Sequence, residues 1–161
     1  MTPTLLLLVL HCNTGVTVSP SACTCVTGRA SVKSRVKEEL RRYDAVFVGA
    51  VISFTDTLLP FLPEAPQSRV RVRKAVVRLE FSWKGPASDS LVIWTGMGSR
   101  DCGYPFEIGE RYLVFAIATD STRLSAHTCS LTQRFQGARE YIRALGDPRF
   151  RREVPSGSTR P

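Results

Sequence analysis

Hydrophobic residues in the middle of the chain form short runs, some continuous and some alternating with polar residues, that are typical of β-strands. The first run, Ala45–Phe54 (AVFVGAVISF), is rich in β-branched and aromatic residues, and Gly49 within it indicates a bulge or a bend. The residues that follow, Thr55–Gln67, contain three prolines, and we predict that they form a loop.

The next strand is long and changes its phase. Between Arg69 and Arg73 the valines occupy even positions, whereas Val77 and the apolar residues after it, up to Trp83, occupy odd positions. A β-bulge shifts a strand by one residue and so exchanges the two faces of its side chains. We therefore predict a bulge near Lys74-Ala75, where the strand bends around the corner of a barrel.

Three further strands follow this one. They are predicted at Ser90–Thr95, Arg111–Thr119 and Arg123–Cys129, separated by segments rich in glycine or in turn residues. Five strands with bends favour an all-β fold, a small closed or nearly closed five-stranded barrel with flanking helices.

The two flanking helices have clear ends. Ser31 can cap an amphipathic helix that runs to Tyr43 with its basic residues facing outwards. A last helix places apolar residues from Phe135 to Leu145 on one face, and Gly146 is expected to stop it.

The two ends of the chain differ from this middle part. Residues 1–22 carry no charged side chain, contain an apolar run at Leu5–Leu10 and end in small residues, as a secretory signal peptide does. The apolar run is too short to span a membrane; a buried N-terminal strand or helix is the alternative. We expect a signal peptide at 1–22, one domain at 23–148 and a disordered basic tail at 149–161.

Composition and candidate chemistry argue against an enzyme. The 161 residues include only two histidines, which rules out most histidine-based metal sites and leaves few options for catalysis. His127 lies in an alternating strand and is expected to be structural, and Glu107 and Glu110 lack the pattern of paired catalytic carboxylates. Gly96-Met97-Gly98 has no third glycine and indicates a turn rather than a nucleotide site. We predict a protein with neither catalytic residues nor a cofactor.

The chain is basic, with 22 Lys and Arg against 14 Asp and Glu and a net charge of +8. Arg69, Arg71 and Arg73 place three positive charges on one face of the long strand. Such a row can contact a polyanion such as a surface polysaccharide, and a solvated strand face is the alternative. Export argues against nucleic acid as the partner.

Export also changes the cysteine count. Cys12 leaves with the signal peptide, and an even number in an exported domain indicates two disulfides among Cys23, Cys25, Cys102 and Cys129, for which three pairings exist. A direct Cys23–Cys25 bond would close a strained small ring, so each is expected to reach a distant partner. A zinc site needs clustered ligands, usually in C-x₂₋₄-C pairs, which this spacing does not supply.

Cleavage after Ala22 would make Cys23 the first residue of the mature protein. Two distant disulfides would pin this end to the domain, so it would lose little entropy on binding a partner. Its α-amino group has a pKa of about 8, against about 10.4 for a lysine. Near neutral pH a useful fraction is therefore unprotonated and able to donate a lone pair to a metal ion.

An ordered set of short motifs runs through the domain: Cys-Thr-Cys-Val at 23–26, Gly-Ala-Val at 49–51, Trp-Lys-Gly at 83–85, Asp-Cys-Gly at 101–103, Tyr-Leu-Val-Phe-Ala at 112–116, and a last cysteine at 129 before a helix. This set resembles the tissue inhibitors of metalloproteinases and, more broadly, the netrin-like domains. The resemblance covers residues 23–145 and implies an OB-type five-stranded barrel with the disulfides Cys23–Cys102 and Cys25–Cys129. The family's third disulfide and its C-terminal subdomain are missing, so the chain resembles a simple, bacterial-type member.

The resemblance also implies a function. The amino and carbonyl groups of Cys23 would chelate the catalytic zinc of a partner metalloendopeptidase, and Thr24 would enter its primed specificity pocket. Cys25 completes this contact segment. Ser99–Cys102, which includes Arg100 and Asp101, would form a neighbouring ridge. The zinc would belong to the protease.

Two alternatives stay open for this exported protein, whether it is extracellular or periplasmic. One is a netrin-like interaction module that binds a protein or a polyanion through the arginine row and inhibits nothing. The other is a lipoprotein in which Cys23 carries a lipid anchor, and an acylated amine would no longer chelate zinc.

Overall fold

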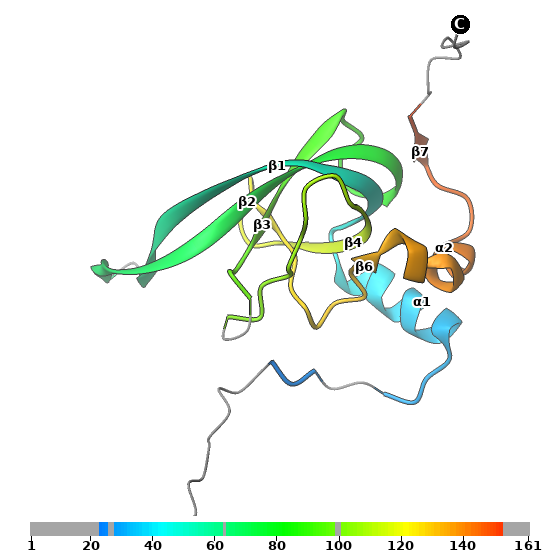
Figure 1. Ribbon diagram of the computed structural model, residues 1–161. Coiled ribbons are helices and arrows are strands. Elements are labelled where there is room, and N and C mark those ends of the chain that lie inside the picture. Colours follow the sequence, from blue (N-terminus) through cyan, green and yellow to red (C-terminus); the bar gives the residue numbers. More distant parts are fainter. Residues whose placement is uncertain (1–22, 26–27, 63, 99–100, 153–161) are drawn as a thin grey trace, which may run out of the picture.

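The computed structural model describes residues 23–25, 28–62, 64–98 and 101–152, and it is mostly β (Figure 1). Seven strands form one mixed sheet: β1 Ala45–Leu62, β2 Ala65–Lys84, β3 Ser90–Thr95, β4 Arg111–Ala118, β5 Leu124–Ser125, β6 Gln133–Arg134 and β7 Phe150–Arg151. The expected signal peptide at 1–22 lies outside the described residues. None of the helices in the described part is long and apolar enough to cross a membrane.

Five of the strands form a ring. β1 pairs with β2, β2 with β3, β3 with β5, β5 with β4, and β4 returns to β1. Among the described strands, the β3–β5 pair alone is parallel. β6 pairs with β4 and β7 pairs with β2, and neither of these two short strands belongs to the ring. The prediction of five paired strands with flanking helices is therefore confirmed at this level.

Two helices and a short 3₁₀ turn pack on one side of the sheet. α1 spans Val32–Arg42, and its Ser31 cap accepts a hydrogen bond from the backbone of Ser34, as expected. The 3₁₀ turn covers Phe135–Gly137, and α2 spans Arg139–Leu145 and ends at Gly146. Gly146 has a φ of 73°, a left-handed conformation that favours glycine.

The core has two parts because β1 and β4 are buried on both faces. Side chains such as Phe47, Ile93 and Tyr112 fill the inside of the ring. On the opposite face, Phe115 and its neighbours pack against the helices, where Val36 of α1 is 2% exposed. The helices thus cover one side of the ring and do not cover the rest of its surface.

The prediction of a loop at Thr55–Gln67 is wrong. β1 and β2 continue as a two-stranded arm that projects beyond the ring on the side away from the helices (Figure 1). Among the described residues, neither strand has another neighbour over most of the arm. Proline is tolerated there because its missing N–H can face the open edge of a strand, so the prolines do not prevent pairing.

A register shift does lie next to the predicted bulge at Lys74-Ala75, but its extra residue is in the partner strand. The pairing of β1 with β2 runs without a shift from Arg69 to Val76, and the shift follows between Val76 and Val77, where Ile52 of β1 is skipped. β2 itself has no extra residue in this stretch, so the change of phase has another cause. The two sets of valines face opposite sides of β2, because the arm and the ring bury opposite faces.

Two further predictions need correction. Only Leu124–Ser125 of the predicted strand Arg123–Cys129 is a strand, followed by a single bridge between His127 and Gly103. The described start of the predicted tail is ordered on the sheet, since β7 pairs with β2 and the Arg149 N–H donates to the Ser82 carbonyl over 2.7 Å. The domain therefore extends past Pro148, and residues 153–161 lie outside the described part.

The bend expected at Gly49 coincides with a register shift between Val48 and Gly49. A Cβ at this position would lie 2.5 Å from the Arg78 carbonyl oxygen, which is backbone and cannot rotate away. Gly49→Ala should therefore lower the free energy of unfolding by roughly 1–3 kcal/mol, as other overpacked sites do.

The measurement is denaturant unfolding with both disulfides intact. Gly137→Ala is the matched control, because its Cβ would meet only the Gln133 side chain, at 3.6 Å. Equal stability of the two variants would contradict the tight contact at Gly49.

Candidate functional site

Two disulfides hold the Cys23-Thr24-Cys25 segment on the surface of the domain. Cys23 is bonded to Cys102 and Cys25 to Cys129, which is the pairing that the resemblance implies. The bonds span 79 and 104 residues of sequence. Each long-range bridge taken alone stabilises the fold by about 4–5 kcal/mol in the chain-entropy model. Both cysteines are partly buried, whereas Thr24 between them is exposed.

Asp101 fixes the loop that carries Cys102. Its carboxylate accepts backbone N–H groups from Met97 over 2.6 Å, Gly98 over 2.9 Å and Gly103 over 3.0 Å. Burial alone would raise the pKa of Asp101, but these hydrogen bonds outweigh it and hold the pKa below its usual value. The carboxylate therefore points towards its own loop and stabilises the conformation of that loop.

Two glycines allow the same loop to fold tightly. Gly96 and Gly103 are so close that a Cβ on Gly103 would lie 2.2 Å from the Gly96 backbone. Cys102, between Asp101 and Gly103, has a φ of 55°, which is rare for a residue with a side chain. The Gly96-Met97-Gly98 motif is thus part of this clamped loop, in agreement with the prediction of a turn.

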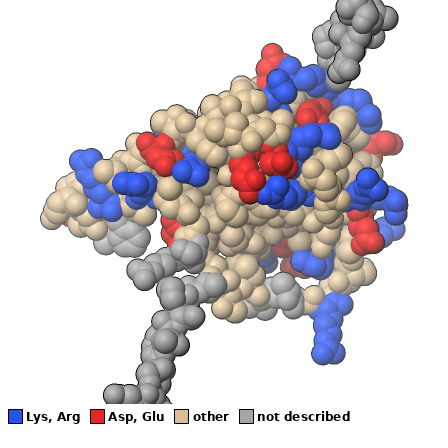
Figure 2. All heavy atoms as spheres, viewed as in Figure 1, with Lys and Arg blue, Asp and Glu red and all other residues tan. Residues whose placement is uncertain are grey.

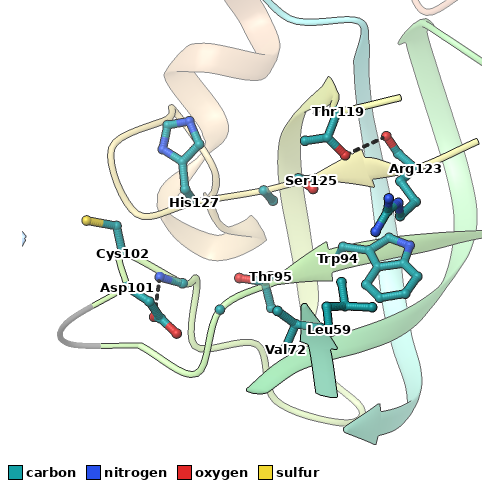
Figure 3. Close-up of a pocket in the computed structure, with 13 residues that line it drawn as sticks. Leu59, Val72, Trp94, Thr95, Asp101, Cys102, Thr119, Arg123, Ser125 and His127 are labelled. Carbon is teal, nitrogen blue, oxygen red and sulfur yellow. Dashed lines mark hydrogen bonds between the residues drawn. The ribbon is translucent and has the colours of Figure 1, made fainter. Parts of the chain in front are cut away.

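A pocket of about 280 Å³ begins at Cys102 and runs towards the arm (Figure 3). Asp101, Cys102 and His127 lie at one end, and Trp94 and Arg123 lie at the other (Figure 3). The arm contributes Leu59 and Val72 to the wall, so residues far apart in sequence meet here: Leu59, Val72, Trp94, Thr95, Gly96, Asp101, Cys102, Gly103, Thr119, Arg123, Ser125, Ala126 and His127.

Two cations lie close to the ring of Trp94, which lines this pocket. The Lys74 ammonium lies 4.6 Å from the centre of its ring and the Arg123 guanidinium 5.4 Å. Sequence reasoning missed these residues because it treated the arm as a loop and so did not bring Leu59 and Val72 next to Trp94. The one available signal was the large aromatic residue at the end of a short strand.

His127 acts as a structural residue, as predicted. Its Nε2 atom forms a hydrogen bond with the hydroxyl of the buried Tyr43 over 3.1 Å, and burial lowers the pKa of His127. Its backbone pairs with Gly103, and the neighbouring Thr128 N–H donates to the Cys102 carbonyl over 2.9 Å. These contacts tie the two loops that carry the disulfides to each other.

A second hollow of about 420 Å³ lies beside the other disulfide, between Cys129 and α1. Glu39 of α1 lines it, and the Oε2 atom of this side chain is buried without a hydrogen-bond partner among the described residues. Burial raises the pKa of Glu39, and the nearby Arg42, 3.6 Å from Oε1, opposes this rise. The Cys23–Cys25 segment therefore has a pocket next to each of its anchors.

The arginine row does not act as one cationic surface. Arg73 forms a two-bond ion pair with Asp56, at 2.7 and 3.0 Å, and its guanidinium lies 4.6 Å from the centre of the Phe54 ring. The bonds from Arg73 lower the pKa of Asp56. Arg69 and Arg71 are exposed and form no ion pair with a described residue. Only two of the three charges are therefore available to a polyanion.

The other candidate residues lie away from the pocket beside Cys102 or outside the described part of the chain. Glu107 and Glu110 both pair with Arg134, so they form a surface ion-pair group. Ser99 and Arg100 of the expected ridge lie outside the described residues. Within the described part, no group of three or more His, Cys, Asp or Glu side chains could hold a metal ion.

Asp101→Asn should destabilise the domain, because an amide cannot accept all three N–H groups. The free energy of unfolding should fall by about 1 kcal/mol at neutral pH. This is a low value for hydrogen bonds to a charged group, because the Asp101 side chain is partly solvated. The folded-state pKa of Asp101 is lowered, so this stability is present above the unfolded pKa and is lost as the pH falls through the folded pKa.

The difference between wild type and Asp101→Asn in denaturant unfolding should therefore shrink below about pH 4. Asp147→Asn is the control, because the exposed Asp147 carboxylate has no hydrogen bond among the described residues. A difference that stays constant down to pH 2.5 would show that the charge of Asp101 is not what holds the loop.

Two comparisons with known proteins find nothing similar to this chain. No family model matches the chain, and a search of curated proteins finds no match.

Proposed function

We propose that this protein is an exported inhibitor of a zinc metalloendopeptidase, built on a netrin-like scaffold in which the five-stranded ring is an OB-type barrel. The ring, the two outer helices and the two disulfide pairs support this reading of the fold. In this proposal the protein supplies no catalytic group and no metal of its own. The zinc belongs to the protease.

The observation that carries the proposal is the exposed Thr24 between two bridged cysteines. A three-residue segment anchored at both ends has few conformations to lose on binding. Its first anchor, Cys102, lies in a loop that Asp101 and the Gly96–Gly103 contact make rigid. Such a segment can enter a narrow cleft without refolding.

The chemistry follows from cleavage after Ala22. The new α-amino group of Cys23 would be partly unprotonated near neutral pH, and with the Cys23 carbonyl oxygen it would form a two-atom chelate. Catalytic zinc keeps an open position for water, and occupying that position removes the nucleophile that the protease requires. Thr24 would then point into the pocket next to the zinc and influence which proteases bind.

The surroundings of the segment offer further contact area. The Asp101–Cys102 loop and the pocket behind it lie beside the first disulfide, and the arm projects beyond them. A protease seated on Cys23 would meet this rigid surface next. The alternative module with a polyanion on the arginine row is less favoured, because Asp56 neutralises Arg73.

The test uses protein whose first residue is Cys23, with both disulfides formed, against a panel of secreted zinc metalloendopeptidases and a fluorogenic peptide substrate. We expect one-to-one inhibition of at least one of them. One alanine placed before Cys23 should weaken that inhibition by more than about 100-fold (about 2.7 kcal/mol), because the Cys23 nitrogen becomes an amide that cannot ligate zinc. Thr24→Arg should change the order of affinities across the panel.

The matched control carries the same single alanine after Pro161 in place of the one before Cys23. Equal inhibition by the N-terminally extended protein would refute chelation, and a panel without any inhibited protease would favour the non-inhibitory module. Mass spectrometry of the naturally exported protein decides between the remaining readings. An acyl chain on Cys23, or a different first residue, would also refute the proposal.

A further inference from the structure

The positive charge of the protein is concentrated at the helical end. Residues 44–134, which contain the ring and the arm, include nine basic and nine acidic side chains among the described residues. Residues 28–43, with α1, include six basic and two acidic ones, and residues 135–152, with α2 and β7, include five basic and two acidic ones. Residues 44–134 are therefore neutral, and the two flanking segments carry the excess of positive charge: +4 on residues 28–43 and +3 on residues 135–152, where it comes from the arginines at and next to β7.

The charges of the two regions also differ in their partners. In the neutral region Arg73, Arg111, Arg123 and Arg134 all form ion pairs with acidic residues of that same region. On the helical segments Arg42 pairs with Glu38 and Glu39, and Arg152 pairs with Asp89. None of the other basic side chains of these segments has an ion pair in the described part of the chain.

Three of the unpaired cations form a straight row on α1. Lys33, Lys37 and Arg41 follow each other at intervals of four residues and are all exposed. This spacing puts them on one stripe of the helix, about 12 Å long. Arg143 of α2 lines the same hollow as Lys33, together with Glu140, so one further cation lies near the start of the row.

The row is held on a rigid support. Ser31 caps the start of α1, the Lys84 ammonium binds the Leu40 and Tyr43 carbonyl oxygens at its end, and Val36 anchors its inner face in the core. The charges are therefore pre-arranged, and a ligand that binds them need not order the helix first.

We propose that the helical end binds a linear anionic polysaccharide that carries sulfate or carboxylate groups. On the face drawn in Figure 2, basic side chains lie along this end of the molecule, with acidic side chains among them. A flexible polymer can follow charges that are spread over several elements, whereas a flat membrane touches only one side of the molecule. Binding of this kind releases counterions and weakens steeply as salt rises.

The exposed apolar side chains argue against a bilayer as the partner. Helices that lie on a membrane insert large apolar side chains into it. In the described part of the chain, the exposed large apolar residues all lie on strands and loops: Ile52, Leu58, Val92, Met97, Ile108 and Ile117. None of them lies on α1 or α2, whose exposed side chains are mostly charged.

The test compares two triple variants of the full mature protein with the same net charge. Lys33→Gln/Lys37→Gln/Arg41→Gln removes the row on α1, and Arg69→Gln/Arg71→Gln/Arg78→Gln removes three exposed charges from β2. Glutamine is a good helix former, so α1 should remain intact. The readout is affinity for heparin, the probe polysaccharide, measured between about 0.05 and 0.3 M salt.

We expect the α1 variant to bind heparin about tenfold more weakly than wild type at 0.15 M salt, and the slope of log K against log salt to fall by about two. The β2 variant should stay close to wild type in both quantities. Equal losses would show that only net charge matters, and a larger loss in the β2 variant would place the site on the sheet.

Two other results would also overturn the proposal. One is no binding of wild type to heparin at 0.15 M salt; the other is stronger binding to vesicles with anionic phospholipid than to heparin. Unfolding curves of both variants provide the control for the fold. The protease assay is independent of this surface, so the α1 variant should inhibit as wild type does whenever wild type inhibits.

Discussion

The double pairing of β1 is the contact on which the rest of the structure depends. Over Val46–Ala50 this strand is bonded to β2 on one side and to β4 on the other, which closes the five-stranded ring. A ring of few strands needs strong local bending, and bulges supply it where β1 meets β2. The same strand packs against α1 on its outer face and extends into the arm. The core, α1 and the arm therefore all depend on the position of β1.

The molecule presents different chemistry on two surfaces. The anchored Cys23-Thr24-Cys25 segment and its clamped loop form one, the exposed cations of α1 form the other, and a hollow lies between Cys25 and α1. The proposed protease contact depends on a few preorganised atoms, whereas the proposed polysaccharide contact depends on summed charge. Because the two surfaces use different residues, a protein retained on an anionic polymer would still present Thr24 to a protease.

The sequence alone predicts the local elements of this fold well. Ser31 and Gly146 mark helix ends through short-range chemistry, and Ser90–Thr95 has the strand pattern of a half-buried segment, so all three were predictable. The arm was missed because three prolines usually indicate a loop, and only the absence of further neighbouring strands explains why they are accepted.

Non-local features could not be predicted in this way. The pocket beside Cys102 depends on Leu59 of the arm meeting Trp94, which no local pattern encodes. The row at Arg69 was selected as the basic surface because its charges alternate along a strand. That Asp56 neutralises Arg73, while Lys33 stays unpaired, is a property of the folded surface.

The contact between the two disulfide loops has a consequence for how the N-terminal segment is secured. The Gly103–His127 bridge and the Thr128–Cys102 hydrogen bond hold Cys102 and Cys129 near each other in the folded domain. Once either disulfide has formed, the other pair is already at high effective concentration, since Cys23 and Cys25 are two residues apart. The second bond then closes only a small loop, so the two entropy gains do not add. What the second disulfide contributes is redundancy: opening one of them leaves Thr24 tethered beside the same loops.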